Sequence, residues 1–396
     1  MKVLRASLAA SLLFVACSLQ AAKPVKWEPW LETGGDVFPS LLIATATVDW
    51  QAEAEVDEDG EEYAPTFGDP NGWFGVNVSN VPANSVLKVE VQGDGWLKPS
   101  QVEVKIKKAT EDLYITPKAV FNYEVLHQIR EQKPVNLTFK VSLNGAVLGE
   151  RNEIVTMHGL NDCPFWVDHG EEAESLDLSW MFAAYVNENH PWIDKILQEA
   201  LQTGLVDSFT GYQSEDSEQV LTQVFAIWHV LQRKGIRYSD ISTTPGAKTV
   251  YCQTVRFLDE SLDATQANCV DGSVLMASLL RKIGITSYLV MVPGHCYLAF
   301  DTDAEGETTV GLETTMLGND KLKPLKELPS MEAKLKKKEF ATSLKTFKSA
   351  ISTANEDLEE NAEKFGDEEE TDYQLINIQE ARDFGIMPIA SGRKRS

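Results

Sequence analysis

The sequence predicts an α+β protein in which an antiparallel β-sandwich precedes a helix-rich α+β domain. Two observations support this class. Residues 27–160 alternate apolar and polar side chains with a period of two, which is typical of half-buried strands. Further along, apolar residues recur at i, i+3, i+4 and i+7, which is typical of amphipathic helices. A chain of 396 residues is long enough for both domains.

Residues 1–22 have the composition of a secretory signal peptide. Lys2 and Arg5 precede a short apolar run, and small residues follow it. We expect cleavage near residue 22 and export to the periplasm, the cell envelope or the medium. Alternatively, "FVAC" is a lipobox and Cys17 carries a lipid anchor, although Phe14 fits that motif poorly. No later stretch is apolar and long enough for a transmembrane span.

The charge balance argues against one class of partner. Without the signal peptide, which contains two basic residues and no acidic one, the net charge changes from −24 to −26. A protein this acidic repels phosphate backbones, so we expect no nucleic-acid partner. The simplest interpretation of the charge is solubility outside the cytoplasm.

The strands of the first domain are predicted from alternating segments separated by turn signals such as "GDG" and "LNG". Their spacing is typical of a sandwich, and we predict an immunoglobulin-like one. The segments are residues 86–92, 101–108, 135–143 and 152–158.

The acidic segment 53–66 partly resembles a calcium-binding loop. If Glu55 is position one, Asp57, Asp59 and Gly60 have suitable offsets. Position one is normally Asp, however, and position twelve is Thr66 rather than a bidentate Glu. We therefore predict a solvated loop and no metal site.

The second domain is predicted to span residues 171–389, after a linker at 161–175. Gly204 and Gly235 are candidate helix C-caps, and residues 390–396 are predicted to be a flexible tail. The predicted helices are 190–204, 217–238 and a charged stretch within 331–370; the predicted strands are 286–292, 295–300 and 308–315. Residues 373–389 become apolar again and are predicted to dock on the domain.

Cysteine usage does not indicate a disulfide framework or a zinc site. Apart from Cys17, the four cysteines are scattered and form no CxxC pair. If one pair is bridged in an oxidising compartment, Cys163 and Cys252 are the better candidates.

Cys269 is the strongest candidate for a chemical role. Asn268 is a good N-cap, which places Cys269 at the first position of a helix that is apolar nearly all round. Partial positive charge at a helix N-terminus favours the nucleophilic thiolate. Cysteine is also among the most buried residue types, so simple packing is an equal alternative on the helix alone.

A histidine and an acid accompany this cysteine. His295 opens a strand, and a hairpin centred on Ala304 would place it directly opposite Glu313, with Cβ atoms ~5 Å apart. This requires an odd turn, since a slip of one residue breaks the pairing. Asp301 lies ~20 Å further along the same strand. Cys296 points to the opposite face from His295, which argues against a metal site.

Residues 218–318 resemble the transglutaminase-like superfamily, whose fold is related to the papain-like cysteine proteases. The resemblance is carried by Cys269 before "SLLRKIGI", His295 in "PGHCYLAF" and Glu313 in "GLETTMLG". "WHVLQRKGIRYSDI" and the Cys-x-Asp pattern of "CVDG" add to it, and Asp271 is expected to be a first-turn acid. The third member is Glu where the family usually has Asp.

The resemblance implies thiol-dependent acyl transfer on protein or peptide amides without a cofactor. Cys269 would be the nucleophile, His295 the base and Glu313 its orienting acid. Gln266 and Gln253 are candidates to complete an oxyanion hole. Water as acceptor gives a protease or amidase, and a lysine amine gives a transglutaminase. Since the superfamily includes inactive members, the alternative is an inert envelope binding or scaffold protein.

Overall fold

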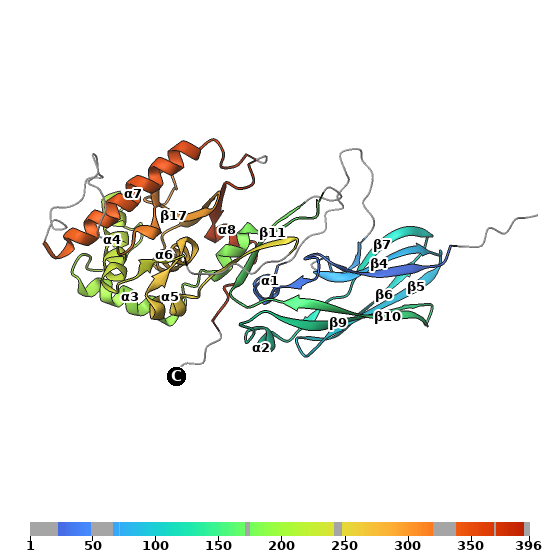
Figure 1. The fold of residues 1–396 in the computed structure, drawn as a ribbon. Coiled ribbons are helices and arrows are strands. Elements are labelled where there is room, and N and C mark those ends of the chain that lie inside the picture. The colour runs from blue at the N-terminus through green and yellow to red at the C-terminus, as the bar shows by residue number, and fades with distance from the viewer. Residues whose placement is uncertain are drawn as a thin grey trace, which may run out of the picture.

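The computed structural model of the protein describes residues 23–48, 66–70, 72–170, 175–240, 248–319, 338–367 and 370–391. The predicted signal peptide with Cys17, most of the acidic loop and most of the C-terminal tail lie outside these residues. Figure 1 shows a strand-rich part on one side and a part that contains helices and a smaller sheet on the other. This arrangement confirms the α+β class.

Residues 26–157 form two sheets with strand orders β1-β4-β7-β3 and β2-β10-β9-β5-β6-β8. Neighbours are antiparallel except in the pairs β2–β10 and β3–β7. The four predicted segments are confirmed as β5, β6, β9 and β10. The strands are β1 (Lys26–Leu31), β2 (Asp36–Val37), β3 (Thr66–Gly68), β4 (Phe74–Val81), β5 (Ser85–Gly93), β6 (Leu97–Ile106), β7 (Thr110–Thr116), β8 (Val120–Phe121), β9 (Lys133–Leu143) and β10 (Ala146–Met157).

The period-two pattern of this part follows from one-sided burial. In β5, Leu87, Val89 and Val91 are buried, whereas Lys88 and Glu90 between them are half-buried. Successive side chains of a strand point to opposite faces, so one apolar face suffices for each sheet to join the core. The alternation in the sequence therefore predicted these strands correctly.

Residues 161–175 are not simply a linker, contrary to the prediction. Asp162–Val167 form strand β11, which pairs with β14 (Val250–Thr254) and with β12 (Leu176–Asp177). The short run "CPFWV" between polar residues is apolar enough to be covered, and its Cys163 is fully buried. This segment is a strand because it pairs with β14, which lies almost ninety residues away in the sequence. The local composition does not reveal that pairing.

Cys163 and Cys252 lie on the neighbouring strands β11 and β14 and are not joined by a disulfide. The register pairs Cys163 with Gln253 and Cys252 with Pro164. The two cysteines are therefore close but not directly opposite each other, and the bridge considered from the sequence is not formed.

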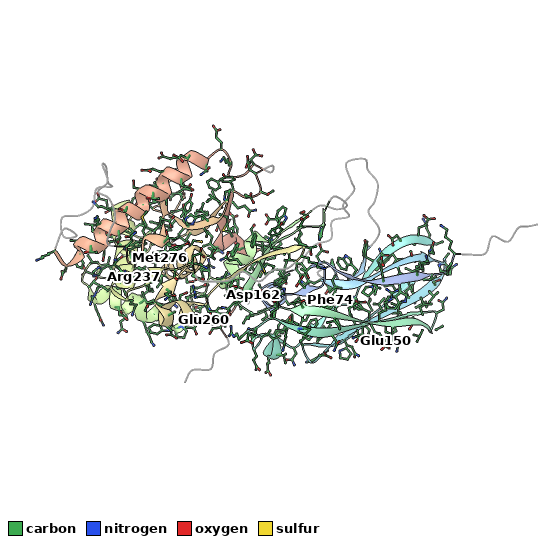
Figure 2. The ribbon with its side chains drawn as sticks, in the orientation of Figure 1. Phe74, Glu150, Asp162, Arg237, Glu260 and Met276 are labelled. Carbon is green, nitrogen blue, oxygen red and sulfur yellow. The ribbon has the colours of Figure 1, made fainter. Side chains whose placement is uncertain are left out.

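The two parts of the molecule join through a packed interface. The short helix α1 (Pro39–Ala44) is buried throughout its length. The Ser40 hydroxyl donates to the carbonyl of Asp162 at 2.6 Å, and the amide of Met387 donates to the carbonyl of Ala44 at 2.9 Å. Figure 2 places Asp162 where the two parts meet, with Phe74 inside the strand-rich part.

The second part contains a sheet of order β18-β17-β16-β19. Its strands are β16 (Ser287–Val292), β17 (His295–Asp301), β18 (Thr309–Leu312) and β19 (Gln374–Asn377). The main helices are α3 (Pro191–Gln202), α4 (Ser217–Arg233), α5 (Leu258–Ala264), α6 (Cys269–Lys282), α7 (Ala341–Asn361) and α8 (Ile378–Asp383). The segment predicted to dock near the C-terminus is confirmed, since it supplies β19 and α8.

This sheet is covered on both faces. Leu289 and Leu298 belong to the main core, which also contains α6, whereas Val290 and Tyr297 pack with Ala354 of α7. The central strands are accordingly apolar at successive positions rather than at alternating ones. Among the described helices, none combines the length and the apolarity needed to cross a membrane.

Replacement of Phe347 by alanine tests how far α7 stabilises this part. Its ring is fully buried, with its centroid 5.4 Å from that of Phe225 and 5.8 Å from that of Trp228. Phe347→Ala should lower the free energy of unfolding by about 3–5 kcal/mol in denaturant titrations, because it leaves a cavity. The exposed Lys345→Ala on the same helix is the matched control and should change stability little. An equal loss of unfolding free energy in the two variants would contradict the packing of Phe347 in the core.

Candidate active site

Cys269 is the first residue of α6, as predicted. The Asn268 side chain accepts from the amide of Asp271 at 2.8 Å, and the Asp271 carboxylate accepts from the amide of Asn268 at 3.0 Å. This reciprocal capping box fixes the backbone on both sides of Cys269. Cys269 is partly exposed, whereas the other three described cysteines are buried.

Asp271 also binds a residue that the sequence interpretation did not identify. Its carboxylate accepts from the backbone amide of Arg256 at 2.7 Å and from the guanidinium of the same residue at 2.8 Å. Burial raises the pKa of Asp271, although these bonds and the positive charge of Arg256 oppose the shift. Asp271 thus ties the loop before α5 to the start of the helix that carries Cys269.

His295 begins β17 directly after the turn at Gly294, which adopts a positive φ of 72°. Its Nε2 lies 2.7 Å from Oε2 of Glu313. The side chain of Cys269 lies close enough to the ring to help raise its pKa. Since Nε2 is engaged by Glu313, Nδ1 is the nitrogen left for the sulfur. The three predicted residues therefore meet, with the imidazole between sulfur and carboxylate.

The register of the hairpin differs from the predicted one by two residues. Leu298 pairs with Leu312 and Asp301 with Thr309, so the hairpin is centred on residue 305 rather than on Ala304. Asp303 explains the shift, because its carboxylate accepts the amides of Glu307 and Thr308, each at 2.8 Å, and thereby closes a longer turn.

Glu313 therefore does not lie directly opposite His295. It lies just beyond the end of β18, as the N-cap of a 3-10 turn at Thr314–Met316. The observed turn, like the predicted one, has an odd number of residues. The side chain of Glu313 therefore still points to the same face of the sheet as that of His295. The length of the Glu side chain allows it to reach the imidazole from this position.

Both carboxylate oxygens of Glu313 are engaged. While Oε2 faces His295, Oε1 accepts from the amide of Thr315 at 3.0 Å and from its hydroxyl at 2.6 Å. Burial works against ionisation, but the bonds from His295 and Thr315 outweigh it, so the pKa of Glu313 is lowered. The acid is held ionised and in one orientation.

The pKa of His295 is raised to about 10 by its hydrogen bonds to Cys269 and Glu313, against the opposing effect of burial. The imidazole is therefore protonated at neutral pH and can donate from one nitrogen to sulfur and from the other to Glu313. An imidazole that is held by an acid beside a cysteine is the arrangement that can activate the thiol as a nucleophile.

The helix start packs closely against the turn that carries Glu313. A Cβ on Gly272 would lie only 2.9 Å from Oγ1 of Thr314, so only glycine fits this position without movement. The hydroxyls of Ser273 and Thr314 are 3.1 Å apart. These contacts set the distance between Cys269 and Glu313, and they give the glycine of "CVDG" a physical role.

Tyr238 borders the site. It lies in strand β13 (Arg237–Tyr238), which pairs in parallel with β15 (Gln266–Ala267), immediately before the Asn268 cap. Burial raises the pKa of the Tyr238 phenol, and the nearby charges of Cys269 and Glu313 add to the effect. The phenol is a neutral hydrogen-bond donor at the edge of the site.

The two candidate oxyanion amides lie on different sheets. Gln266 is in β15, three residues before Cys269, whereas Gln253 is in β14 opposite Cys163. Within the described residues, neither side chain is hydrogen-bonded to Cys269, His295 or Glu313. The oxyanion role of both glutamines stays a prediction.

The remaining polar candidates have structural surroundings. Asp301 is buried at the far end of β17, where it accepts from Tyr288 and Thr309 at 3.0 and 2.7 Å. Cys296 is buried, while the adjacent His295 is partly exposed, as strand alternation requires. In the part of the chain that the structure describes, no three His, Cys, Asp or Glu side chains are grouped so as to hold a metal ion.

No protein-family model matches the chain, and no curated protein matches it. The chemistry of the site is therefore inferred from its own geometry.

The protonation of His295 is directly testable by nuclear magnetic resonance. In protein carrying labelled histidine, with the resonance assigned through His295→Asn, we expect the ring to titrate near pH 10. Cys269→Ala and Glu313→Gln should each lower this pKa, since each removes a hydrogen bond that favours the charged ring.

The same shift affects stability in a defined direction. Folding raises the pKa of His295, so its contribution is complete below about pH 6.5 and is lost as the pH rises toward 10. Titration of the assigned ring near pH 6.5 would contradict the ion-pair arrangement.

Proposed function

We propose that the protein is an exported, thiol-dependent acyl transferase or hydrolase that acts on protein or peptide amides. The observation that carries this proposal is the position of His295, whose Nε2 lies 2.7 Å from Glu313 and whose pKa is raised by the nearby Cys269 and Glu313. A nucleophile, a base and an orienting acid in this order are the constellation that acyl transfer requires.

The proposed reaction begins with attack of the Cys269 sulfur on an amide carbonyl carbon. The tetrahedral intermediate collapses as the carbon–nitrogen bond breaks, and the departing nitrogen takes the proton of the His295 imidazolium. The acyl group remains on sulfur as a thioester. Water or an amine then attacks it and gives a proton to the neutral ring, and expulsion of the thiolate restores the starting pair.

Two features of the site support this chemistry, one at the start of α6 and one at Glu313. The backbone amide of Cys269 belongs to the first turn, whose amides have no partner within the helix, so it is a natural donor to the oxyanion. Glu313 has its other oxygen held by Thr315, which fixes the orientation of the imidazole. The glutamines Gln266 and Gln253 and the phenol of Tyr238 are candidates for a second oxyanion donor.

The finer fold assignment belongs to the same proposal. A cysteine at the start of a buried helix, a histidine opening a strand and an acid after the next strand resemble the transglutaminase-like superfamily. The two facing sheets of residues 26–157 are consistent with the immunoglobulin-like sandwich proposed for the first domain. With a signal peptide over residues 1–22, the substrates would be proteins or peptides outside the cytoplasm.

Alkylation by a fluorescent iodoacetamide tests the nucleophile. At neutral pH, Cys269 should be labelled rapidly, because a neighbouring imidazole and a helix N-terminus favour the reactive thiolate. His295→Ala should slow this labelling at least about tenfold, since one pKa unit alone changes the thiolate fraction tenfold. Mass spectrometry of tryptic peptides measures the site and the rate.

The matched control is His127→Ala, which removes a partly exposed histidine of the strand-rich part. It should leave the rate unchanged, and the buried Cys296 should react slowly in every variant. Equal, slow labelling of Cys269 and Cys296 in the unaltered protein would refute the enzyme proposal and favour a binding or scaffold role.

Product analysis separates the acceptors. We expect a library of glutamine-containing peptides, incubated with the protein and a primary amine, to yield products that disappear with Cys269→Ala. Cleaved or deamidated peptides would identify hydrolysis, and amine adducts would identify transfer. Glu313→Gln should reduce the rate by about 10²–10⁴, because the imidazole loses its orienting charge. Products that persist with Cys269→Ala would contradict the proposed nucleophile.

A further inference from the structure

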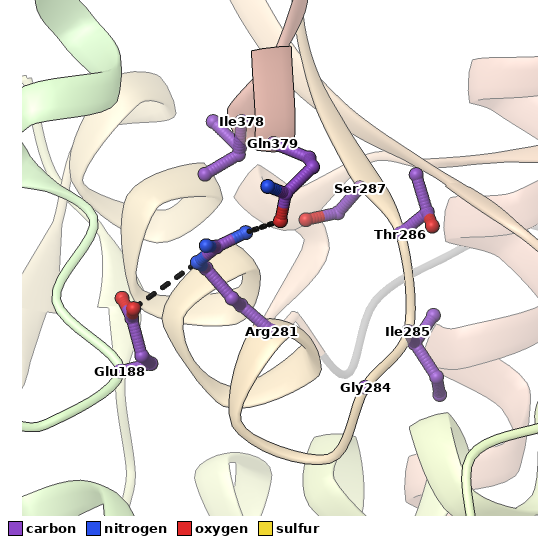
Figure 3. Close-up of a pocket in the computed structure, with 8 residues that line it drawn as sticks. All are labelled: Glu188, Arg281, Gly284, Ile285, Thr286, Ser287, Ile378 and Gln379. Carbon is purple, nitrogen blue, oxygen red and sulfur yellow. Dashed lines mark hydrogen bonds and ion pairs between the residues drawn. The ribbon is translucent and has the colours of Figure 1, made fainter. Parts of the chain in front are cut away.

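The two ends of α6 differ in what they present to a ligand. The cavity at its C-terminal end, of about 260 Å³, is lined by polar groups that pair with one another: Arg281 donates to Glu188 at 3.1 Å and to Gln379 at 2.9 Å (Figure 3). At the N-terminal end, the thiol of Cys269 is partly exposed and the nearby Tyr238 is 47% exposed. A substrate can therefore contact both of these side chains.

Strand pairing directs Tyr238 toward the start of α6. Tyr238 lies directly opposite Ala267 in the β13–β15 pair, and the amide of Ser239 donates to the carbonyl of Ala267 at 3.0 Å. Residues that lie opposite each other in a strand pair point to the same face. The side chains of Tyr238 and Ala267 therefore share one face, and Ala267 is separated from Cys269 only by the cap residue.

The shared face is turned toward the 3-10 turn that follows Glu313. A Cβ on Gly272 would lie 3.9 Å from the Cβ of Ala267 and 2.9 Å from Oγ1 of Thr314. Ala267 thus faces the place where the first turn of α6 packs against that 3-10 turn. Tyr238, on the same face, is directed to the same place.

The chain beyond the 3-10 turn also returns to β13. A Cβ on Gly318 would lie only 2.6 Å from the carbonyl oxygen of Ile236, so the two segments are in direct contact. The electrostatics agree with this placement, because the pKa of Tyr238 is raised by burial and also by the nearby charges of Cys269 and Glu313. The phenol is therefore close to both the sulfur and the carboxylate of the candidate site.

The Tyr238 hydroxyl is available as a donor. Within the described residues it forms no hydrogen bond, and its raised pKa keeps it protonated at neutral pH. The candidate glutamines have different positions. Gln266 lies opposite Arg237, so its side chain is on the other face of the β13–β15 pair, and Gln253 belongs to β14, which pairs with β11 instead.

We propose that the Tyr238 hydroxyl is the second donor to the oxyanion, together with the backbone amide of Cys269. This role rests on the proposed function, because the oxyanion forms only when the sulfur adds to an amide carbonyl carbon. As the sulfur–carbon bond forms, the π electrons of the carbonyl move to its oxygen, which accepts from the phenol. As the carbon–nitrogen bond breaks, that electron pair returns to re-form the carbonyl, and the phenol keeps its proton throughout.

Tyr238→Phe tests this role, because it removes the hydroxyl and keeps the ring. With a glutamine-containing peptide that the unaltered protein converts, we expect kcat to fall about 10²–10³-fold and KM to change little, since the lost bond acts on the transition state. Iodoacetamide is attacked at a saturated carbon, where no oxyanion forms. The rate of Cys269 alkylation should therefore be the same in this variant as in the unaltered protein.

Tyr123→Phe alters a similarly exposed tyrosine of the strand-rich part and should change neither rate. The role of Tyr238 is overturned if Tyr238→Phe keeps its kcat, even where Tyr238→Ala is inactive, because the ring alone would then matter. It is also overturned if alkylation slows as much as turnover, which would indicate a displaced thiol, or if only Gln266→Ala lowers kcat. A complete lack of products with the unaltered protein would instead refute the proposed function, and the role of Tyr238 with it.

Discussion

The carboxylate of Asp271 is the contact on which the geometry of the candidate site depends. It caps the helix that begins at Cys269 and, through Arg256, holds the loop that leads into α5. A buried carboxylate is stable only when its oxygens are fully hydrogen-bonded, so the three groups that satisfy it are fixed relative to one another. The position of the thiol in space follows from this arrangement.

The same loop connects the site to the strand-rich part. Asn161 donates to the carbonyl of Val255 at 2.8 Å and to the carboxylate of Glu260 at 2.7 Å. Next to it, the buried His158 lies 2.7 Å from Asp36 and 3.8 Å from Asp162. Burial lowers the pKa of His158, but the two carboxylates outweigh it and the pKa is raised. A charged cluster thus lies next to Asn161, the residue that contacts the loop before α5.

The spacing of apolar residues predicted most helices and strands. Each of these elements is buried on one face or on all sides, and such burial gives a regular recurrence of apolar residues in the sequence. The start of α6 was predicted down to its cap, since Asn268 and Asp271 cap each other's backbone over only three residues. The contact between His295 and Glu313 was predicted from a hairpin register that differs from the observed one by two residues. The residues were nevertheless identified, because a shift of two preserves the face on which a strand side chain lies.

Where the prediction failed, the deciding contact was distant in the chain. The segment 161–175 was interpreted as a linker, yet it includes β11 because β14 provides hydrogen-bonding partners for it. The role of Arg256 had no sequence signal, since its contact with Asp271 arises where α6 meets the loop before α5. The sequence alone determined the period of each element, the cap at Cys269 and the identity of the three residues that meet. Only the tertiary structure decided the hairpin register and the ion pair at Asp271, because each depends on side chains brought together from separate elements.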